Sequence, residues 1–197
     1  MAMSTTSPRG RYHHGDLRAA CLQAARELLE EGAELSLRAV ARRASVSPAA
    51  PYRHYADKDA LVSALAEQGC RELHDCLAAA APADATPDDF AALAVAYVRF
   101  ALAHPALFRI MFRTSCTPAD TERDAAAADV DAFVRRAAAR ARPDADPDAL
   151  GVACWALLHG LAFLYLEGKL PTDPPAAVDA RVRTSVGAMI DARRPGW

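Results

Sequence analysis

Apolar residues recur along this chain of 197 residues at spacings of three and four, the period of a helix with one buried face. The first such stretch predicts a helix over residues 16–31, ended by Gly32. Its apolar face holds Leu17, Cys21, Ala24 and Leu28. No stretch shows the sustained alternation of apolar and polar residues that a half-buried strand requires. The pattern therefore predicts an all-α protein.

Residues 36–58 hold two short helical segments joined by a tight turn. Ser36 is placed to N-cap the first segment, and Ser47 followed by Pro48 is placed to N-cap the second. Val46 supplies the apolar side chain that packs two crossed helices. The apolar stripe of the first segment is Leu37, Val40, Ala41 and Ala44. Because the second segment carries aromatic, basic and imidazole groups, the layout is that of a DNA-reading helix-turn-helix.

A longer helix follows, with Asp57 as its N-cap and an end near Ala80. Residues 82–87 then turn to Pro, Asp and Thr, which marks a break in the chain. Further helices are predicted over residues 88–103, 105–112, 121–140, 148–167 and 175–193. The expected architecture has three helices in an N-terminal head and about six behind it, about nine helices in all.

Residues 149–166 carry no charged side chain. Their number, 18, is at the lower limit of length for a membrane span. His159 and Gly160 at the centre, with acidic residues at both ends, favour a helix buried in a core or dimer interface instead. The last helix carries an apolar seam of Val178, Val182, Val186, Met189 and Ile190. Paired with residues 148–167, and with the same two helices of a second subunit, this seam would close a four-helix bundle.

The basic residues gather where DNA would lie. Residues 1–60 hold nine Lys and Arg against seven Asp and Glu, whereas residues 61–197 hold fourteen against eighteen. This small excess predicts a few phosphate contacts per subunit. The cationic arm Arg9–His14 is either a disordered terminus or a phosphate or minor-groove contact. The polar, basic start of the chain is unlike a signal peptide, and we expect a cytoplasmic protein with no membrane association.

The sequence offers little for catalysis or metal binding. Its five cysteines are scattered without a C-x-x-C pair, which argues against a disulfide framework or a zinc site. We expect them to be buried small hydrophobes, with redox sensing as the alternative. Cys, His, Asp and Ser are not arranged as a nucleophile with its base, and no Gly-rich phosphate loop is present. We therefore expect no catalytic residue, no metal and no cofactor.

An ordered set of residues between Asp16 and Leu65 resembles the TetR family of bacterial regulators. Ser45 stands where that family usually has glycine, and Pro51 where it usually has Leu, Val or Ile. As the fourth helical residue after Ser47, Pro51 would forfeit only the first backbone bond of its helix. The set comprises Ala24-Ala25, Leu28, Gly32, Leu37, Val40-Ala41, Ala44-Ser45-Val46-Ser47, Tyr52-Arg53-His54-Tyr55 and Asp57-Lys58-Asp59-Ala60-Leu61.

The resemblance implies a homodimer on double-stranded DNA, with two heads in successive major grooves about 34 Å apart or somewhat wider on a palindromic operator. It implies core positions for Val46 and Tyr55. The implied phosphate contacts are Ser36, Tyr52, His54 and Lys58, and the implied base-edge contacts are Arg38, Ala49, Ala50 and Arg53.

In the C-terminal half, Trp155, His159 and Gly160 form a W-x-x-x-H-G pattern that resembles a TetR subgroup named for its Trp-His-Gly motif. Trp155 and His159 share one helix face, and Gly160 would let another helix approach closely. One interpretation is a ligand pocket, and the other is a core histidine bonded to a neighbouring helix with aromatic packing around it. The pocket residues would be Phe108, Met111, Phe112, Trp155, His159 and Phe163.

These expectations combine into a regulator with a basic arm (1–15), a DNA-binding domain (16–60) and an effector-binding and dimerisation domain (61–197). It is expected to be a repressor that leaves its operator when a small apolar or aromatic molecule binds. Such a molecule would select one arrangement of the heads, and the helix that begins at Lys58 would transmit the change. An effector-independent DNA-binding protein with a filled core is the main alternative. A redox-sensing regulator is the less favoured one.

Overall fold

The computed structural model describes residues 17–81, 87–112 and 121–191 of the chain. Within these ranges it contains eight α-helices, one 3₁₀ helix and no strand, which confirms the all-α expectation. The cationic arm lies outside the described residues. The elements are α1 (Leu17–Glu30), α2 (Leu37–Arg43), η1 (Pro51–Arg53), α3 (Lys58–Ala80), α4 (Pro87–Ala103), α5 (Pro105–Met111), α6 (Thr121–Ala141), α7 (Pro147–Leu166) and α8 (Pro175–Ile190).

Local signals set the ends of the first helices as predicted. The Ser36 hydroxyl accepts from the Ala39 amide at 3.2 Å and caps α2. The Asp57 carboxylate accepts from the Ala60 amide at 2.8 Å and caps α3. Each cap satisfies a backbone donor that the first turn of a helix leaves without a partner. The starts of α2 and α3 are therefore fixed by residues beside them in the sequence.

The ends of α1 and α2 are built alike from different residues. At the end of α1, Gly32 has φ +68°, and the Ala33 amide donates to the Leu28 carbonyl at 2.9 Å. At the end of α2, Ser45 has φ +56°, and the Val46 amide donates to the Ala41 carbonyl at 3.0 Å. Both are Schellman endings, which place one residue in the left-handed region that glycine adopts most easily.

The second helix of the helix-turn-helix differs from the prediction. We expected it to start at Pro48 as an α-helix, but residues 48–50 form a turn and only Pro51–Arg53 form a 3₁₀ helix. The reason is Pro51, which has no N–H to donate to the Ser47 carbonyl. The Ser47 carbonyl accepts instead from the Ala50 amide at 2.9 Å, three residues on. The same three-residue spacing recurs where the His54 amide donates to the Pro51 carbonyl at 3.0 Å.

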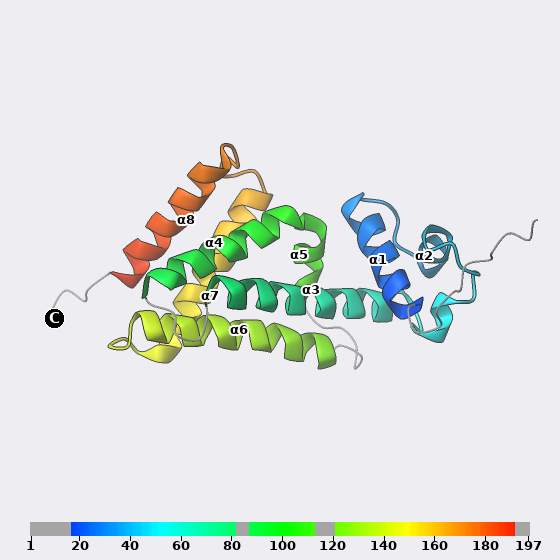
Figure 1. The fold of residues 1–197 in the computed structure, drawn as a ribbon, viewed down its shortest axis with the longest axis horizontal. Helices are drawn as coiled ribbons and strands as arrows, with labels where there is room; N and C mark the ends of the chain where they lie inside the picture. The colour runs from blue at the N-terminus through cyan, green and yellow to red at the C-terminus, as the bar shows by residue number, and fades with distance from the viewer. Residues whose placement is uncertain (1–16, 82–86, 113–120, 192–197) are drawn as a thin grey trace, which may run out of the picture.

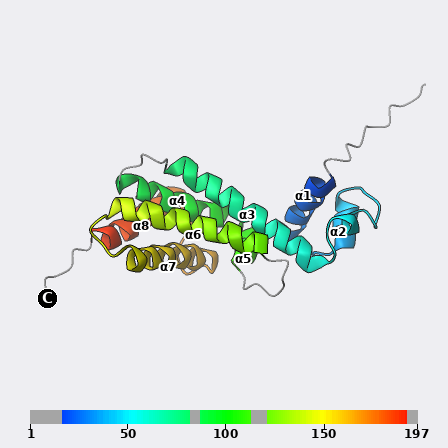
Figure 2. The same cartoon turned by 90° about the horizontal axis from the view of Figure 1, so that it is seen from below.

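Helix α3 joins the head, residues 17–57, to the rest of the molecule. It runs from beside α2 and η1 along part of α6, with α4 and α5 beside it (Figure 1). The same view turned by 90° shows α3 and α6 side by side and α7 beneath α6 (Figure 2). The buried leucines of α3, Leu61, Leu65, Leu73 and Leu77, are at most 1% exposed. A continuous core therefore connects the start of α3, beside the head, to its far end.

Helix α7 is long and apolar enough to span a membrane by length and composition alone. One of its faces is buried against α4 and α6, including Leu150, Cys154, Leu158 and Tyr165. In the α8 seam, Val178, Val182 and Val186 are buried as well. The predicted partner of this seam was α7, but the seam packs mainly on α4. The α8 seam therefore already has its partner within the chain.

Candidate DNA-binding surface and ligand cleft

The end of the helix-turn-helix presents the side chains that were predicted to meet DNA. Tyr52 is 53% exposed, which is high for a tyrosine, and Arg53, His54 and Lys58 beside it are exposed too. Arg38 and Ala49 are also exposed, and Ser36 is half-buried in its capping position. Ala50, in contrast, is only 8% exposed. Tyr55 is buried, as its implied core role requires, and its hydroxyl donates to the Arg18 carbonyl at 3.3 Å.

Ion pairs divide the arginines of the head into two groups. Arg43 donates to Glu31 at 2.6 and 2.9 Å and to Glu27 at 3.3 Å, which holds its guanidinium against α1. These contacts lower the pKa of Glu31. Among the described residues, Arg38 and Arg53 have no carboxylate within ion-pair distance. The positive charge left for phosphate or base contacts is therefore concentrated around α2 and η1.

Two residues of α1, Arg26 and Glu30, contact the larger domain through hydrogen bonds. Arg26 donates to the Glu72 carboxylate of α3 at 2.6 and 2.8 Å and to Nδ1 of His104 at 3.2 Å. Glu30 accepts from the backbone amides of Ala106 and Leu107, at 3.2 and 3.1 Å. His104, the N-cap residue of α5, makes no side-chain cap of its own. The cap of α5 is thus supplied by a carboxylate of the head.

At the other end of α5, an open cleft of about 430 Å³ lies among α5, α6 and α7. We call it the aromatic cleft, because ring contacts dominate its wall. His159 lies 4.5 Å from the Phe112 ring and 4.4 Å from the Trp155 ring, measured between centroids. The aromatic cleft is lined by Arg109, Met111, Phe112, Asp124, Ala127, Trp155, His159 and Phe163. Five of the six predicted pocket residues therefore come together.

Phe108, the sixth predicted residue, lies behind this wall. It is 0% exposed and makes an edge contact with Phe112 at 5.3 Å between ring centroids. The sequence prediction missed Tyr97 of α4, whose hydroxyl lies 2.9 Å from Nδ1 of His159. It also missed Arg109 and Asp124 at the cleft, and nothing near them in the sequence indicates that they meet there.

Burial decides the charge of His159. Desolvation lowers its pKa from 6.5 to about 4, although a hydrogen bond to the Trp155 backbone and the Asp131 carboxylate act in the opposite direction. Tyr97 is fully buried, and desolvation raises the pKa of its phenol well above 10. Near neutral pH the pair is therefore an uncharged imidazole beside an uncharged phenol.

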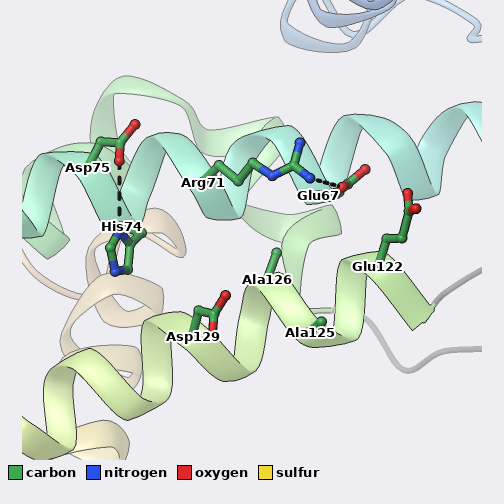
Figure 3. Close-up of a pocket in the computed structure, with 8 residues that line it drawn as sticks. All are labelled: Glu67, Arg71, His74, Asp75, Glu122, Ala125, Ala126 and Asp129. Carbon is green, nitrogen blue, oxygen red and sulfur yellow. Dashed lines mark hydrogen bonds and ion pairs between the residues drawn. The ribbon is translucent and has the colours of Figure 1, made fainter.

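A second cleft, of about 370 Å³, lies on the other side of α6, between α6 and α3. Figure 3 shows its two sides: Glu67, Arg71, His74 and Asp75 come from α3, and Glu122, Ala125, Ala126 and Asp129 come from α6. Arg71 is paired with Glu67 across one helical turn. We call this the acidic cleft. Among the described residues no group of three metal-binding side chains is assembled, here or elsewhere.

The described cysteines fit the role of buried hydrophobes. Cys21, Cys70 and Cys154 are 0% exposed, and Cys76 is half-buried. Burial raises the pKa of the Cys70 thiol to about 12 and that of Cys154 to about 11. Oxidation proceeds through the thiolate, so these shifts disfavour reactivity. Cys116 lies outside the described residues.

Comparison with known families matches both parts of the chain. Residues 22–65 match the description "Bacterial regulatory proteins, tetR family", and residues 90–189, about half of the chain, match "Tetracyclin repressor-like, C-terminal domain". No curated protein matches the chain at a significant level.

Solved structures share the fold over nearly its full length. A protein of unknown function from Rhodococcus sp. RHA1 is 34% identical, with a TM-score of 0.79 over 93% of this chain and 98% of that one. A TetR/AcrR regulator from Thermobifida fusca YX-ER1 is 21% identical, with a TM-score of 0.66 over 91% and 99%. PfmR, a TetR family regulator from Thermus thermophilus, is 16% identical, with a TM-score of 0.66 over 87% and 97%. The last two share the fold alone. With both domain matches and a relative above 30% identity, the chain belongs to the TetR family, as a DNA-binding transcriptional regulator and not an enzyme.

Proposed function

We propose that this regulator acts in the cytoplasm as a homodimeric repressor, binding a palindromic operator and releasing it when a small apolar or aromatic molecule occupies the aromatic cleft. The observation that carries the DNA-binding part is the exposed group Tyr52, Arg53, His54 and Lys58 at the end of the helix-turn-helix. Its basic and aromatic side chains are the types that contact phosphates and base edges.

The roles within this surface follow from exposure and chemistry. Arg53 and Arg38 are proposed base-edge contacts, since a guanidinium can bond both acceptors of guanine in the major groove. Tyr52, His54, Lys58 and Ser36 are proposed phosphate contacts, with Lys58 at the N-terminus of α3. Ala49 is exposed and small enough for close approach to a base. Because Ala50 is buried, we leave it out of the proposed interface.

The proposed dimer uses the exposed face of α7. Val152 is 58% exposed and Leu164 is 43% exposed, and Ala156 and Gly160 lie between them on the same row of every fourth residue. A Cβ built on Gly160 would meet nothing within 4 Å, so no described element of its own chain uses the close approach that this glycine allows. An exposed apolar row of this kind is typical of a helix that pairs with a copy of itself.

The cleft and the head are linked by two helices, which supports the release mechanism. Helix α3 begins beside the recognition segment and continues along the larger domain, as a helix that couples a ligand to the arrangement of the heads must. Helix α5 is held by Glu30 of the head at its first residues and contributes Met111 to the cleft at its last. A ligand that shifts Met111 or Phe112 therefore acts on an element that the head also contacts.

The Trp155, His159 and Gly160 arrangement also supports placing the domain in the Trp-His-Gly subgroup.

One observation favours the effector-independent alternative. Tyr97 already satisfies a His159 nitrogen from within the core, and the rings around His159 contact one another. Such a histidine does not need a ligand. Thermal unfolding with a panel of aromatic compounds separates the two functions, because a molecule that binds only the folded state raises the melting temperature. No shift at millimolar concentrations of any compound would contradict the effector part of the proposal.

The DNA-binding part is tested with operators selected from random duplex DNA by the purified protein. Arg53→Ala should relax sequence preference at one position per half-site, at a cost of about 1–3 kcal/mol for that base pair. Lys58→Ala should weaken all duplexes similarly and reduce the slope of log affinity against log salt by about one. Arg140→Ala is the matched control, because Arg140 is exposed near the end of α6, which lies far from the head (Figure 1). An equal loss of specificity in the Arg53 and Lys58 variants would contradict the assignment.

A further inference from the structure

The recognition segment, residues 48–54, is built on backbone bonds that join residues three apart. The Ala50 amide donates to the Ser47 carbonyl at 2.9 Å, and the Arg53 amide donates to the Ala50 carbonyl at 3.2 Å. The His54 amide donates to the Pro51 carbonyl at 3.0 Å. An α-helix would instead join residues four apart, beginning with a bond from the amide of residue 51 to the Ser47 carbonyl. Proline at position 51 has no N–H for that bond.

Both ends of the segment are anchored. Before it, the Val46 amide closes α2 by donating to the Ala41 carbonyl at 3.0 Å. After it, the Tyr55 amide donates to the Pro51 carbonyl at 3.0 Å, four residues back, and the Tyr55 side chain is buried. A change of spacing between Val46 and Tyr55 is therefore absorbed by the residues of the segment, whose side chains must reorient.

The spacing decides the direction of the Arg53 side chain. A 3₁₀ helix turns by about 120° and rises by about 2.0 Å per residue, whereas an α-helix turns by about 100° and rises by about 1.5 Å. Over the three steps from Ala50 to Arg53, the two spacings differ by about 60° in direction and about 1.5 Å in position. Carried to the end of an arginine side chain, this rotation exceeds the step of about 3.4 Å between neighbouring base pairs. The spacing therefore selects the base edge that Arg53 reaches.

Pro51 acts on the DNA-binding surface without being part of it. It is the buried residue of η1, which packs against α1 and α2. Tyr52 and Arg53, the next two residues, are exposed. Because the Pro51 ring is buried, it contacts neither a base nor a phosphate, and its effect on DNA binding passes through the backbone.

We propose that Pro51 is a specificity-determining residue of the head. By withholding a backbone N–H, it keeps the recognition segment in the three-residue spacing and so positions Arg53 on its base pair of the operator. Pro51 is thus a positioning residue. This inference rests on the proposed function, because it takes Arg53 as a base-edge contact.

Pro51→Leu tests this role in the full chain, since leucine supplies the missing N–H and keeps the position apolar. The base pair that Arg53 reads is identified first, as the position where Arg53→Ala loses preference among operators selected from random duplex DNA. The native chain should prefer the selected base pair there by about 5- to 150-fold. Pro51→Leu should reduce this preference at least about fivefold or select another base pair. The slope of log affinity against log salt should change by less than about one, because the cap of α3 places Lys58.

Hydrogen exchange of the new amide at position 51 reports the spacing itself. Slow exchange indicates a bond to the Ser47 carbonyl, four residues back. Pro51→Ala supplies the same N–H without the larger side chain, so it should change the base preference as Pro51→Leu does, and it replaces that variant if leucine prevents folding. Pro147→Ala is the matched control, because Pro147 is exposed in the first turn of α7, where an amide has no partner within the helix. This control should keep the native operator preference.

The outcomes separate the role of Pro51 from that of Arg53. Unchanged base preference in a variant whose position-51 amide exchanges slowly overturns the role of Pro51, while the role of Arg53 stands. Fast exchange in both folded variants also overturns it, since another feature then sets the spacing. A change of preference in Pro51→Leu alone assigns the effect to side-chain volume and overturns the role of the missing N–H. Full preference in Arg53→Ala overturns the base-edge contact and the role of Pro51 together.

Discussion

The recognition segment of the head and the interior of the larger domain use aromatic side chains in opposite ways. Tyr52 of the head is 53% exposed, and the residues beside it are charged or polar. Phe108 of the larger domain is 0% exposed and is surrounded by other rings. The head keeps its shape through a small core that includes Leu28, Val40 and Tyr55, and its exposed residues around Tyr52 are left for a partner. The larger domain keeps its shape through its interior, so its function and its stability depend on the same residues.

The largest expected effect is on Phe108. Phe108→Ala removes a fully buried ring that contacts Tyr97, Phe112 and Phe163, and the free energy of unfolding should fall by about 3–5 kcal/mol. Tyr52→Ala should change it by less than about 0.5 kcal/mol, as expected for an exposed side chain, yet weaken operator binding. Urea unfolding and DNA titration of both variants measure these quantities. Similar losses of stability in the two variants would break the comparison.

Acid should destabilise the larger domain through His159. The pKa of this group is 6.5 in the unfolded chain and about 4 in the folded protein, so the unfolded chain binds the proton first as the pH falls. The stability contributed by the neutral imidazole is complete above pH 6.5 and is lost towards pH 4, a change of about 3 kcal/mol. Urea unfolding from about pH 7.5 to about pH 4.5, which spans this window, should therefore show a steeper decline for the native chain than for His159→Gln. Parallel profiles would place the histidine in contact with solvent.

A smaller effect is expected at the N-terminus of α3, where the head meets the larger domain. Asp57→Ala removes the acceptor for the Ala60 amide and should cost about 1 kcal/mol of unfolding free energy. Asp57→Asn keeps an oxygen in the same place and should retain most of the native value. Thermal or urea unfolding of the two variants gives the difference. If both variants lose equally, charge and not capping holds this helix end.

The smallest effect concerns the end of α2. Ser45→Gly relieves a left-handed backbone at φ +56° and should stabilise the protein by about 0.5–1 kcal/mol, measured by urea unfolding. The related end of α1 already has Gly32, and Gly32→Ala should lose a similar amount. Because the Ser45 side chain also has an interaction of its own, a loss of stability in Ser45→Gly would show that this interaction outweighs the backbone strain.

The features that could be predicted from the sequence are those that neighbouring residues determine. Ser36 and Asp57 cap helices within three residues, and Gly32 ends one within a single turn. The start of the recognition segment was predicted wrongly although its cause is also local. The missing N–H of Pro51 costs more than the one backbone bond expected from the sequence, because Pro51–Arg53 take the spacing of a 3₁₀ helix.

Features that depend on distant residues could be predicted only in part. The Trp155 and His159 face was visible because both lie on one helix, but Tyr97 stands in an apolar helix with nothing beside it to indicate its bond to His159. The α8 seam was correctly expected to be buried, but its predicted partner α7 was wrong, because α4 is a second apolar helix and the sequence does not show which of the two lies against α8. Glu30 looks like any surface carboxylate in sequence, since the amides it caps are 76 and 77 residues away.

The Glu30 contact has a consequence for building chimeric regulators. The cap of α5 is supplied by the head, so exchanging residues 17–57 for the head of another regulator would remove it unless the donor carries a carboxylate at the position of Glu30. A chimera lacking it would still have its operator-binding head and its cleft, joined through α3, but would lose the link that runs through α5. The two parts of this protein are separable along the sequence, but they are not interchangeable modules.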